Sequence, residues 1–133
     1  MNPDQLVTAF CAEWATPDPV RIADYFAEDA VYHNIPMEPV IGRDAIREFI
    51  AGFVGAFGAI DFRIHRQLTD GGQSPHAESA SGVVMNERID VFTLNGILVE
   101  LPVVGVFEIT DGKITTWRDY FDMAPIRAAT GVG

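Results

Sequence analysis

The 133-residue chain has the length of one domain, and its nine Lys and Arg against nineteen Asp and Glu give a net charge of −10. Such an acidic surface repels phosphate backbones and anionic lipid, which argues against nucleic-acid and membrane binding. The single cysteine, Cys11, excludes an internal disulfide and a cysteine-based zinc site. No apolar run is long enough to span a membrane and no signal region opens the chain, so we expect a cytoplasmic protein with one domain over residues 1–133.

The first half of the chain has helical spacing. A helix is predicted to begin at Pro3 with Asn2 as its N-cap. Its apolar residues recur every four positions: Leu6, Phe10 and Trp14. A second helix is expected over residues 20–26, an extended segment over 30–34, and a third helix between Gly42 and Gly58. The apolar stripe of that third helix contains Ile46, Phe49, Ile50, Phe53, Val54 and Phe57.

The second half of the chain predicts an antiparallel meander of four strands. We expect them at residues 60–68, 77–92, 97–109 and 113–121, with a bulge near Gly82, a surface loop over 70–75 and a short helix over 123–129. Asn95-Gly96 and Asp111-Gly112 are typical hairpin turns. N-terminal helices packed on a strongly curved, mixed or antiparallel sheet make an α+β fold, here a cone with a deep apolar pocket for a small molecule.

The strand over residues 86–92 carries charges inside an apolar sheet. Alternation places Asn86, Arg88, Asp90 and Phe92 on one face. An Arg and an Asp on a covered face must either pair with each other or take part in chemistry, because isolated buried charges are costly. From these residues alone, a structural ion pair is the more common explanation.

Two further segments carry polar groups at strand ends. Tyr32 and Asn34 lie on one side of the extended segment, where a phenol and a carboxamide can hold one water; a simple turn before the following proline is the alternative. Asp122 ends the last strand, where it either takes part in chemistry or caps the next helix. Asp119 is a rival carboxylate, which we expect to pair with an arginine at the surface.

Several common sites are absent from the sequence. It has neither a phosphate-binding Gly-x-x-x-x-Gly-Lys loop nor a Gly-x-Gly-x-x-Gly motif. Ser74 lies in a loop without the context of a serine nucleophile. The three histidines, His33, His65 and His76, lack the spacing of metal ligands. We therefore expect no metal and no cofactor.

Together, the three polar segments resemble the limonene-1,2-epoxide hydrolase family. The similarity comprises Tyr32-x-Asn34, Arg88-x-Asp90 and Asp122, in that order, with about fifty residues from Asn34 to Arg88 and about thirty from Asp90 to Asp122. It covers nearly the whole chain. It implies the curved-sheet cone that is also found in nuclear transport factor, ketosteroid isomerases and polyketide cyclases.

The resemblance implies a one-step hydrolysis without a metal or a covalent intermediate. Asp122 is expected to act as general base on a water that Tyr32 and Asn34 also hold. Asp90 is expected to protonate the epoxide oxygen, and Arg88 to lie between the two carboxylates. The chemistry is consistent, because two carboxylates at one site resist joint ionisation and can serve as one acid and one base.

A small apolar epoxide and water are the expected partners. We expect the residues that bind the substrate to come from Met37, Phe53, Phe92, Val103 and Phe107, although helically spaced phenylalanines more often belong to the core. A homodimer is expected through an apolar outer face of the meander, formed by Trp117, Val104 and Val106.

Two other functions remain open from the sequence. One is an isomerase or cyclase on the same fold, which uses a carboxylate base and a separate oxyanion donor. The other is a non-catalytic module for ligand binding or dimerisation, in which Arg88 and Asp90 are only a buried ion pair.

Overall fold

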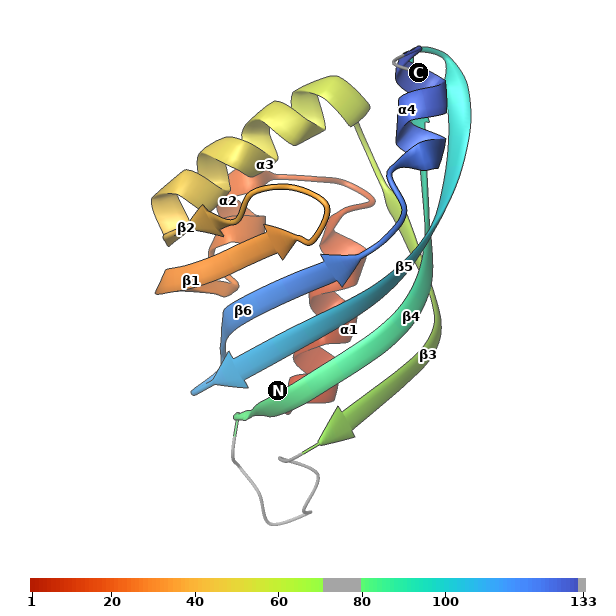
Figure 1. The fold of residues 1–133 in the computed structure, drawn as a ribbon. Helices are drawn as coiled ribbons and strands as arrows, with labels where there is room; N and C mark the ends of the chain where they lie inside the picture. The colour runs from red at the N-terminus through yellow and green to blue at the C-terminus, as the bar shows by residue number, and fades with distance from the viewer. Residues whose placement is uncertain (71–79, 132–133) are drawn as a thin grey trace.

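A six-stranded sheet and four helices make up the part of the chain that the computed structural model describes, residues 1–70 and 80–131 (Figure 1). The helices are α1 (Pro3–Glu13), α2 (Pro19–Ala23), α3 (Arg43–Phe57) and α4 (Ala124–Thr130). The strands are β1 (Phe26–Asn34), β2 (Val40–Ile41), β3 (Asp61–Asp70), β4 (Gly82–Leu94), β5 (Ile97–Thr110) and β6 (Lys113–Tyr120).

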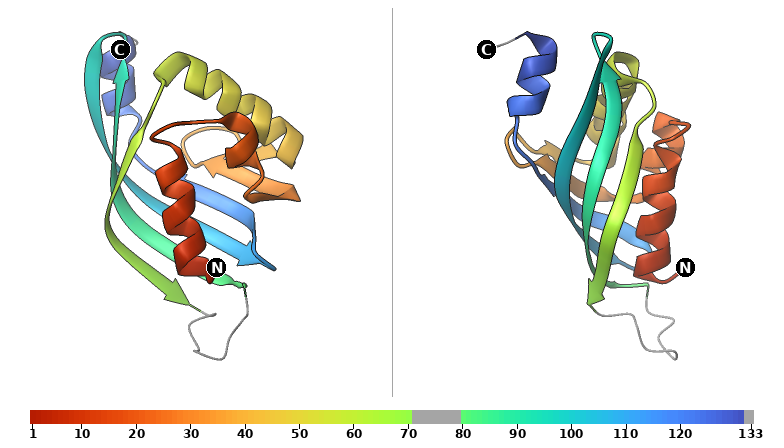
Figure 2. Two further views of the ribbon diagram at one scale, coloured as in Figure 1. Left: turned by 180° about the vertical axis from the view of Figure 1, so that it is seen from behind. Right: turned by 90° about the vertical axis from the view of Figure 1, so that its right-hand side faces the viewer.

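The sheet is mixed, strongly curved and not closed, in the order β2-β1-β6-β5-β4-β3. Strands β3 to β6 form the predicted antiparallel meander. At its edge, β1 pairs in parallel with β6 and antiparallel with β2. Helices α1 and α3 lie on the concave side, and α4 lies near the tip of the β4–β5 hairpin (Figure 2). The α+β cone expected from the sequence is therefore confirmed.

Local sequence signals explain where the elements begin and end. Asn2 and Gln5 form a reciprocal capping box at the start of α1. The β4–β5 hairpin turns at Asn95 and Gly96, both with positive φ, as a two-residue type I′ turn requires. The inner face of the sheet and α1 then enclose a core of interlocking rings, in which Phe10 makes an edge-on contact with Trp117 at 4.9 Å between ring centroids.

Two details differ from the sequence-based expectation. The second helix ends at Ala23, three residues early, because the chain turns there into the longer strand β1. β4 pairs with β5 in unbroken register from Gly82 onward, and a register shift lies instead between Ile64 and Arg66 of β3. The expected loop at 70–75 and the start of the strand expected at 77 fall mostly outside the described residues. Within the described ranges, no helix has the length and hydropathy to span a membrane.

Candidate active site

Arg88 lies at the centre of a buried polar cluster on the inner face of β4. The alternation predicted for this strand holds, since Asn86, Arg88, Asp90 and Phe92 are all buried. The Arg88 side chain is fully buried, and its guanidinium lies over the ring of Phe62 at 4.6 Å. A charge in this position needs hydrogen-bond partners of opposite charge.

Every N–H of the Arg88 guanidinium has an acceptor. Nε and Nη2 each donate at 2.9 Å to the two oxygens of Asp90. Nη2 also donates to Oδ2 of Asp119 at 2.8 Å, and Nη1 to its Oδ1 at 3.2 Å. The remaining bond runs from Nη1 to Oδ1 of Asn86 at 2.9 Å. Arg88 therefore holds two carboxylates at once, each through both of its oxygens.

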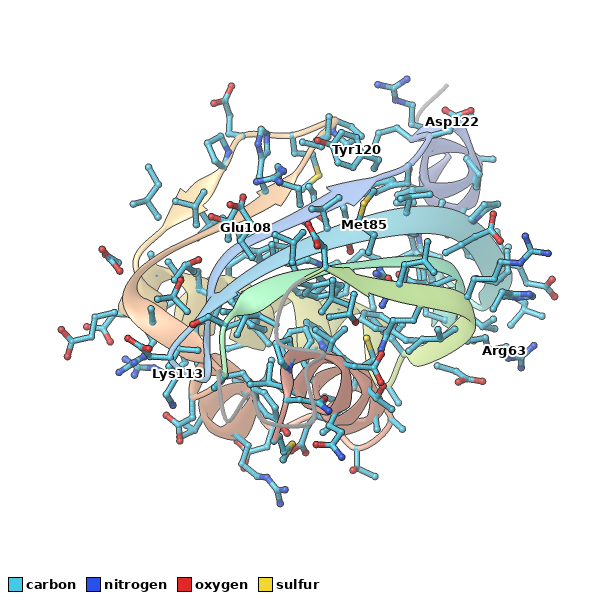
Figure 3. All side chains as sticks on the ribbon, turned by 90° about the horizontal axis from the view of Figure 1, so that it is seen from below. Arg63, Met85, Glu108, Lys113, Tyr120 and Asp122 are labelled. Atoms are coloured by element: carbon cyan, nitrogen blue, oxygen red, sulfur yellow. The ribbon has the colours of Figure 1, made fainter. Side chains whose placement is uncertain are left out.

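The second carboxylate beside Arg88 is Asp119, and the expectation that Asp122 lies there is wrong. Asp119 is only 4% exposed, so it does not form the surface pair expected for it either. Asp122 follows the end of β6, where the backbone leaves the sheet, and its side chain is exposed at the edge of the molecule beside α4 (Figure 3). Its Oδ1 accepts a hydrogen bond from the backbone N–H of Ala124, the first residue of α4, at 2.9 Å. The N-cap of α4 is Met123, so Asp122 is not the N-cap that was the alternative to a chemical role, although its side chain binds the N–H of the first helical residue.

Trp117 orients Asp119 from the same strand. Its indole Nε1 donates to Oδ1 of Asp119 at 2.7 Å. With the bond from Arg88, both lone pairs of Oδ1 are occupied, whereas Oδ2 accepts only one of the described hydrogen bonds. One oxygen of Asp119 is therefore left able to accept a proton.

Tyr32 and Asn34 lie beside this carboxylate at the end of β1. Parallel pairing places Tyr32 opposite Trp117 and Asn34 opposite Asp119. The ring of Tyr32 stacks on Trp117 at 4.3 Å, and its hydroxyl donates to Oδ1 of Asn34 at 3.3 Å. Tyr32 and Asn34 therefore lie next to the carboxylates held by Arg88, as expected, but the second of these carboxylates is Asp119 and not Asp122.

Gly105 of β5 is a site residue that the sequence analysis missed. A Cβ at this position would clash with Nη1 of Arg88 and would lie 2.9 Å from the carboxylate oxygen Oδ1 of Asp119 and from Oδ1 of Asn86. Only glycine leaves room for the guanidinium against β5. An isolated glycine in an otherwise apolar strand is the signal that could have indicated this close approach.

The two carboxylates face an apolar cavity of about 260 Å³. Its polar lining residues are Asn34, Asp90 and Asp119. Its aliphatic and thioether lining residues are Met37, Ile60, Leu101, Val103, Met123 and Ile126. Its aromatic lining residues are Trp14, Tyr32, Phe49, Phe53, Phe57, Phe62, Phe92 and Phe121. Of the residues expected to contact a substrate, Met37, Phe53, Phe92 and Val103 line the cavity, whereas Phe107 is fully buried in the core and does not.

The pKa values of Asp90 and Arg88 are both raised within this cluster. Desolvation raises the pKa of Asp90, and the nearby charge of Asp119 raises it further, although the hydrogen bonds from Arg88 oppose the shift. Burial alone would lower the pKa of Arg88, but Asp119 and Asp90 together raise it well above its ordinary value. Arg88 thus stays charged, and Asp90 retains a proton more readily than an ordinary aspartate.

No group of three or more potential metal-ligating side chains occurs in the described ranges. The candidate site consists of carboxylates, an arginine, an amide and a phenol, a set suited to proton transfer within an apolar pocket.

Comparison with known proteins identifies the family of this chain. The model of the limonene-1,2-epoxide hydrolase catalytic domain matches residues 1–131. The chain belongs to the limonene-1,2-epoxide hydrolase family. Its relative in Mycobacterium tuberculosis, the epoxide hydrolase EphG, is 33% identical over 96 residues, which cover 72% of this chain and 57% of EphG. The match thus spans little more than half of EphG.

Solved structures give the same family and fold. An epoxide hydrolase of this family type from M. tuberculosis is 29% identical and has a TM-score of 0.76, covering 94% of this chain and 86% of its own. A protein with a ketosteroid isomerase-like fold from Catenulispora acidiphila has a TM-score of 0.81 at 20% identity. The match covers 100% of this chain and 96% of that protein's chain. At that identity the second likeness concerns the fold alone.

Proposed function

We propose that this member of the limonene-1,2-epoxide hydrolase family adds water in one step to a small apolar epoxide and releases a vicinal diol. The observation that carries the proposal is the pair of buried carboxylates, Asp90 and Asp119, which share Arg88 and face an apolar cavity. Opening an epoxide near neutral pH needs a base for the water and an acid for the leaving oxygen, and this pair supplies both.

Asp119 is the proposed general base. Its Oδ2 has an unused lone pair among the described contacts, and Tyr32 and Asn34 lie at the same end of the cavity. A water held by these three groups attacks a ring carbon and gives its proton to Asp119. The role first assigned to Asp122 thus passes to Asp119.

Asp90 is the proposed general acid. Its raised pKa favours the protonated form that can donate to the epoxide oxygen as the C–O bond breaks. After the step Asp119 carries a proton and Asp90 is ionised, so one proton must return to Asp90 before the next turnover. Arg88 stabilises the single negative charge that the pair carries before and after the reaction.

A single-turnover reaction in ¹⁸O-labelled water tests the direct attack. With enzyme in excess over a small epoxide, the first diol should contain the label, because the attacking oxygen comes from solvent. A first diol without the label would mean that an enzyme carboxylate attacks the epoxide, and would contradict the mechanism.

An isomerase or cyclase is the competing function, because the chain shares its fold with the ketosteroid isomerase-like protein of C. acidiphila and a fold can carry more than one activity. Such enzymes work with a carboxylate base and an oxyanion donor, and do not need a second carboxylate on the same arginine. Conversion of a Δ5-ketosteroid without hydrolysis of any epoxide would favour this alternative.

We also propose that two copies associate through the outer face of β3 to β6. Trp117, expected on this face, is instead buried on the inner side. The exposed apolar residues of this face include Leu68, Met85, Val104 and Tyr120, which lie on adjacent strands. In the strand register they lie beside Arg66, Glu87 and Arg118. Both signs of charge next to an apolar patch suit pairing of the face with itself.

A further inference from the structure

A continuous chain of aromatic rings forms one wall of the cavity. The ring of Tyr32 meets Phe49 edge-on at 5.6 Å, and Phe49 stacks with Phe53 at 6.2 Å. Phe53 contacts Phe57 at 4.2 Å, and Phe57 meets Phe92 edge-on at 5.3 Å. We call these five rings the aromatic wall.

The aromatic wall begins and ends beside the proposed catalytic groups. Tyr32 donates its hydroxyl hydrogen bond to Asn34 at one end, and Phe92 follows Asp90 on the same face of β4 at the other. Between them, Phe49, Phe53 and Phe57 project from successive turns of α3 and are half-buried, with surface left to line the cavity. A group attached to an epoxide held at Asp90 therefore lies against these rings.

We propose that the site favours epoxides that carry an aryl ring over saturated epoxides of the same size. The inference rests on the proposed epoxide hydrolysis and specifies its substrate class. The hydrophobic effect barely separates a phenyl from a cyclohexyl group, because both remove similar apolar area from water. Contacts between aromatic rings do separate them. Each edge-on or offset ring pair raises the association constant by about two- to twelvefold beyond the effect of buried area.

The size of the cavity suits such a substrate. A volume of about 260 Å³ accommodates a molecule with roughly ten non-hydrogen atoms, which is near the lower limit of common ligand pockets. An aryl epoxide with one methylene between ring and epoxide is of this size, and the spacer keeps the aryl ring from activating the epoxide electronically.

The test compares 1,2-epoxy-3-phenylpropane with 1,2-epoxy-3-cyclohexylpropane, which have the same number of non-hydrogen atoms. The phenyl epoxide should have a kcat/KM at least about fivefold higher. Phe53→Leu and Phe57→Leu should each lower this ratio toward one, because each removes a ring from the aromatic wall. Ile126→Leu changes the aliphatic part of the lining and should leave the ratio unchanged. Equal kcat/KM values for the two epoxides would overturn the inference.

A binding measurement separates this inference from the proposed function. The amides 3-phenylpropanamide and 3-cyclohexylpropanamide carry no epoxide, so their Kd values by calorimetry do not depend on turnover. Tighter binding of the phenyl amide, lost in Phe53→Leu, supports the aromatic wall even if neither epoxide is hydrolysed. Hydrolysis of both epoxides with equal Kd values for the two amides would contradict the inference while leaving the proposed function intact.

Discussion

The indole N–H of Trp117 donates a 2.7 Å hydrogen bond to Oδ1 of Asp119, two residues further along β6. On a strand, two residues apart means the same face, so β6 supplies both the carboxylate and the group that orients it. The same indole stacks on Tyr32. Trp117 therefore contacts the proposed base and one of the proposed holders of the water, although it does not line the cavity.

Replacing Trp117 with Phe should lower kcat by about ten- to hundredfold, the range expected when a hydrogen bond to a charged group is lost. KM should change little, because Trp117 is absent from the cavity lining. Trp14→Phe provides the contrast, since Trp14 lines the cavity and its buried Nε1 has no hydrogen-bond partner among the described residues. That variant should change mainly KM. Steady-state kinetics of both variants check the prediction, and a Trp117 variant with unchanged kcat would contradict it.

Gly105→Ala should damage both the site and the fold. The added methyl group would meet Arg88, Asn86 and Asp119, so the guanidinium must move. We expect a loss of about 1–3 kcal/mol in the free energy of unfolding, as for other overpacked cores, and loss of hydrolysis.

Gly52→Ala is the matched control for this change. Gly52 lies within α3, and a Cβ there has no neighbour within 4 Å. The free energy of unfolding of the Gly52→Ala variant should rise by about 0.5–1 kcal/mol relative to the wild type. Chemical denaturation of both variants gives the two values, and equal stabilities would show that the close approach at Gly105 is unimportant.

Local patterns predicted most of the fold. The stripe on α3, the Asn95-Gly96 turn and the alternation of β4 each depend on neighbouring residues only, and each is found where it was expected. The parallel pairing of β1 with β6 joins residues far apart in the sequence and has no local signal. The two-residue strand β2 is likewise too short to leave a pattern.

The position of the second carboxylate depends on where β6 ends. From the sequence, Asp119 was expected to form a surface ion pair, and the resemblance assigned the role to Asp122. The choice depends on the sheet register and on the backbone leaving the sheet after Tyr120, neither of which can be derived from residue spacing. Arg88 and Asp90 raised no such ambiguity, because they lie in the middle of a long strand.

Asp90→Asn should change how stability depends on pH. The pKa of Asp90 is raised in the folded protein, so the folded state binds its proton more tightly than the unfolded chain, whose pKa is about 4. The stabilisation from this proton is complete below about pH 4 and is lost as pH rises through the folded value. Asparagine does not ionise, so the stability of the variant relative to the wild type should increase over that range. Urea denaturation at a series of pH values measures the difference, and a constant difference would contradict the shift.

Met85→Glu should dissociate the proposed dimer. Met85 is exposed on the outer face of β4, and two copies related by a twofold axis would bury the new charge (Figure 3). Val20→Glu is the control, because Val20 is similarly exposed but lies on α2. Sedimentation velocity should show a dimer for the wild type and for the Val20 variant, and a monomer for the Met85 variant. A monomeric wild type at micromolar concentration would rule out the proposed assembly.

The most direct test of the proposed chemistry compares epoxide hydrolysis by Asp119→Asn and Asp122→Asn. Asp119→Asn should reduce kcat by about a hundred- to ten-thousandfold, because it removes the general base. Asp122→Asn should stay near wild-type activity, since asparagine can accept the same backbone hydrogen bond from Ala124. The reverse outcome, an active Asp119 variant and an inactive Asp122 variant, would contradict the assignment of the site.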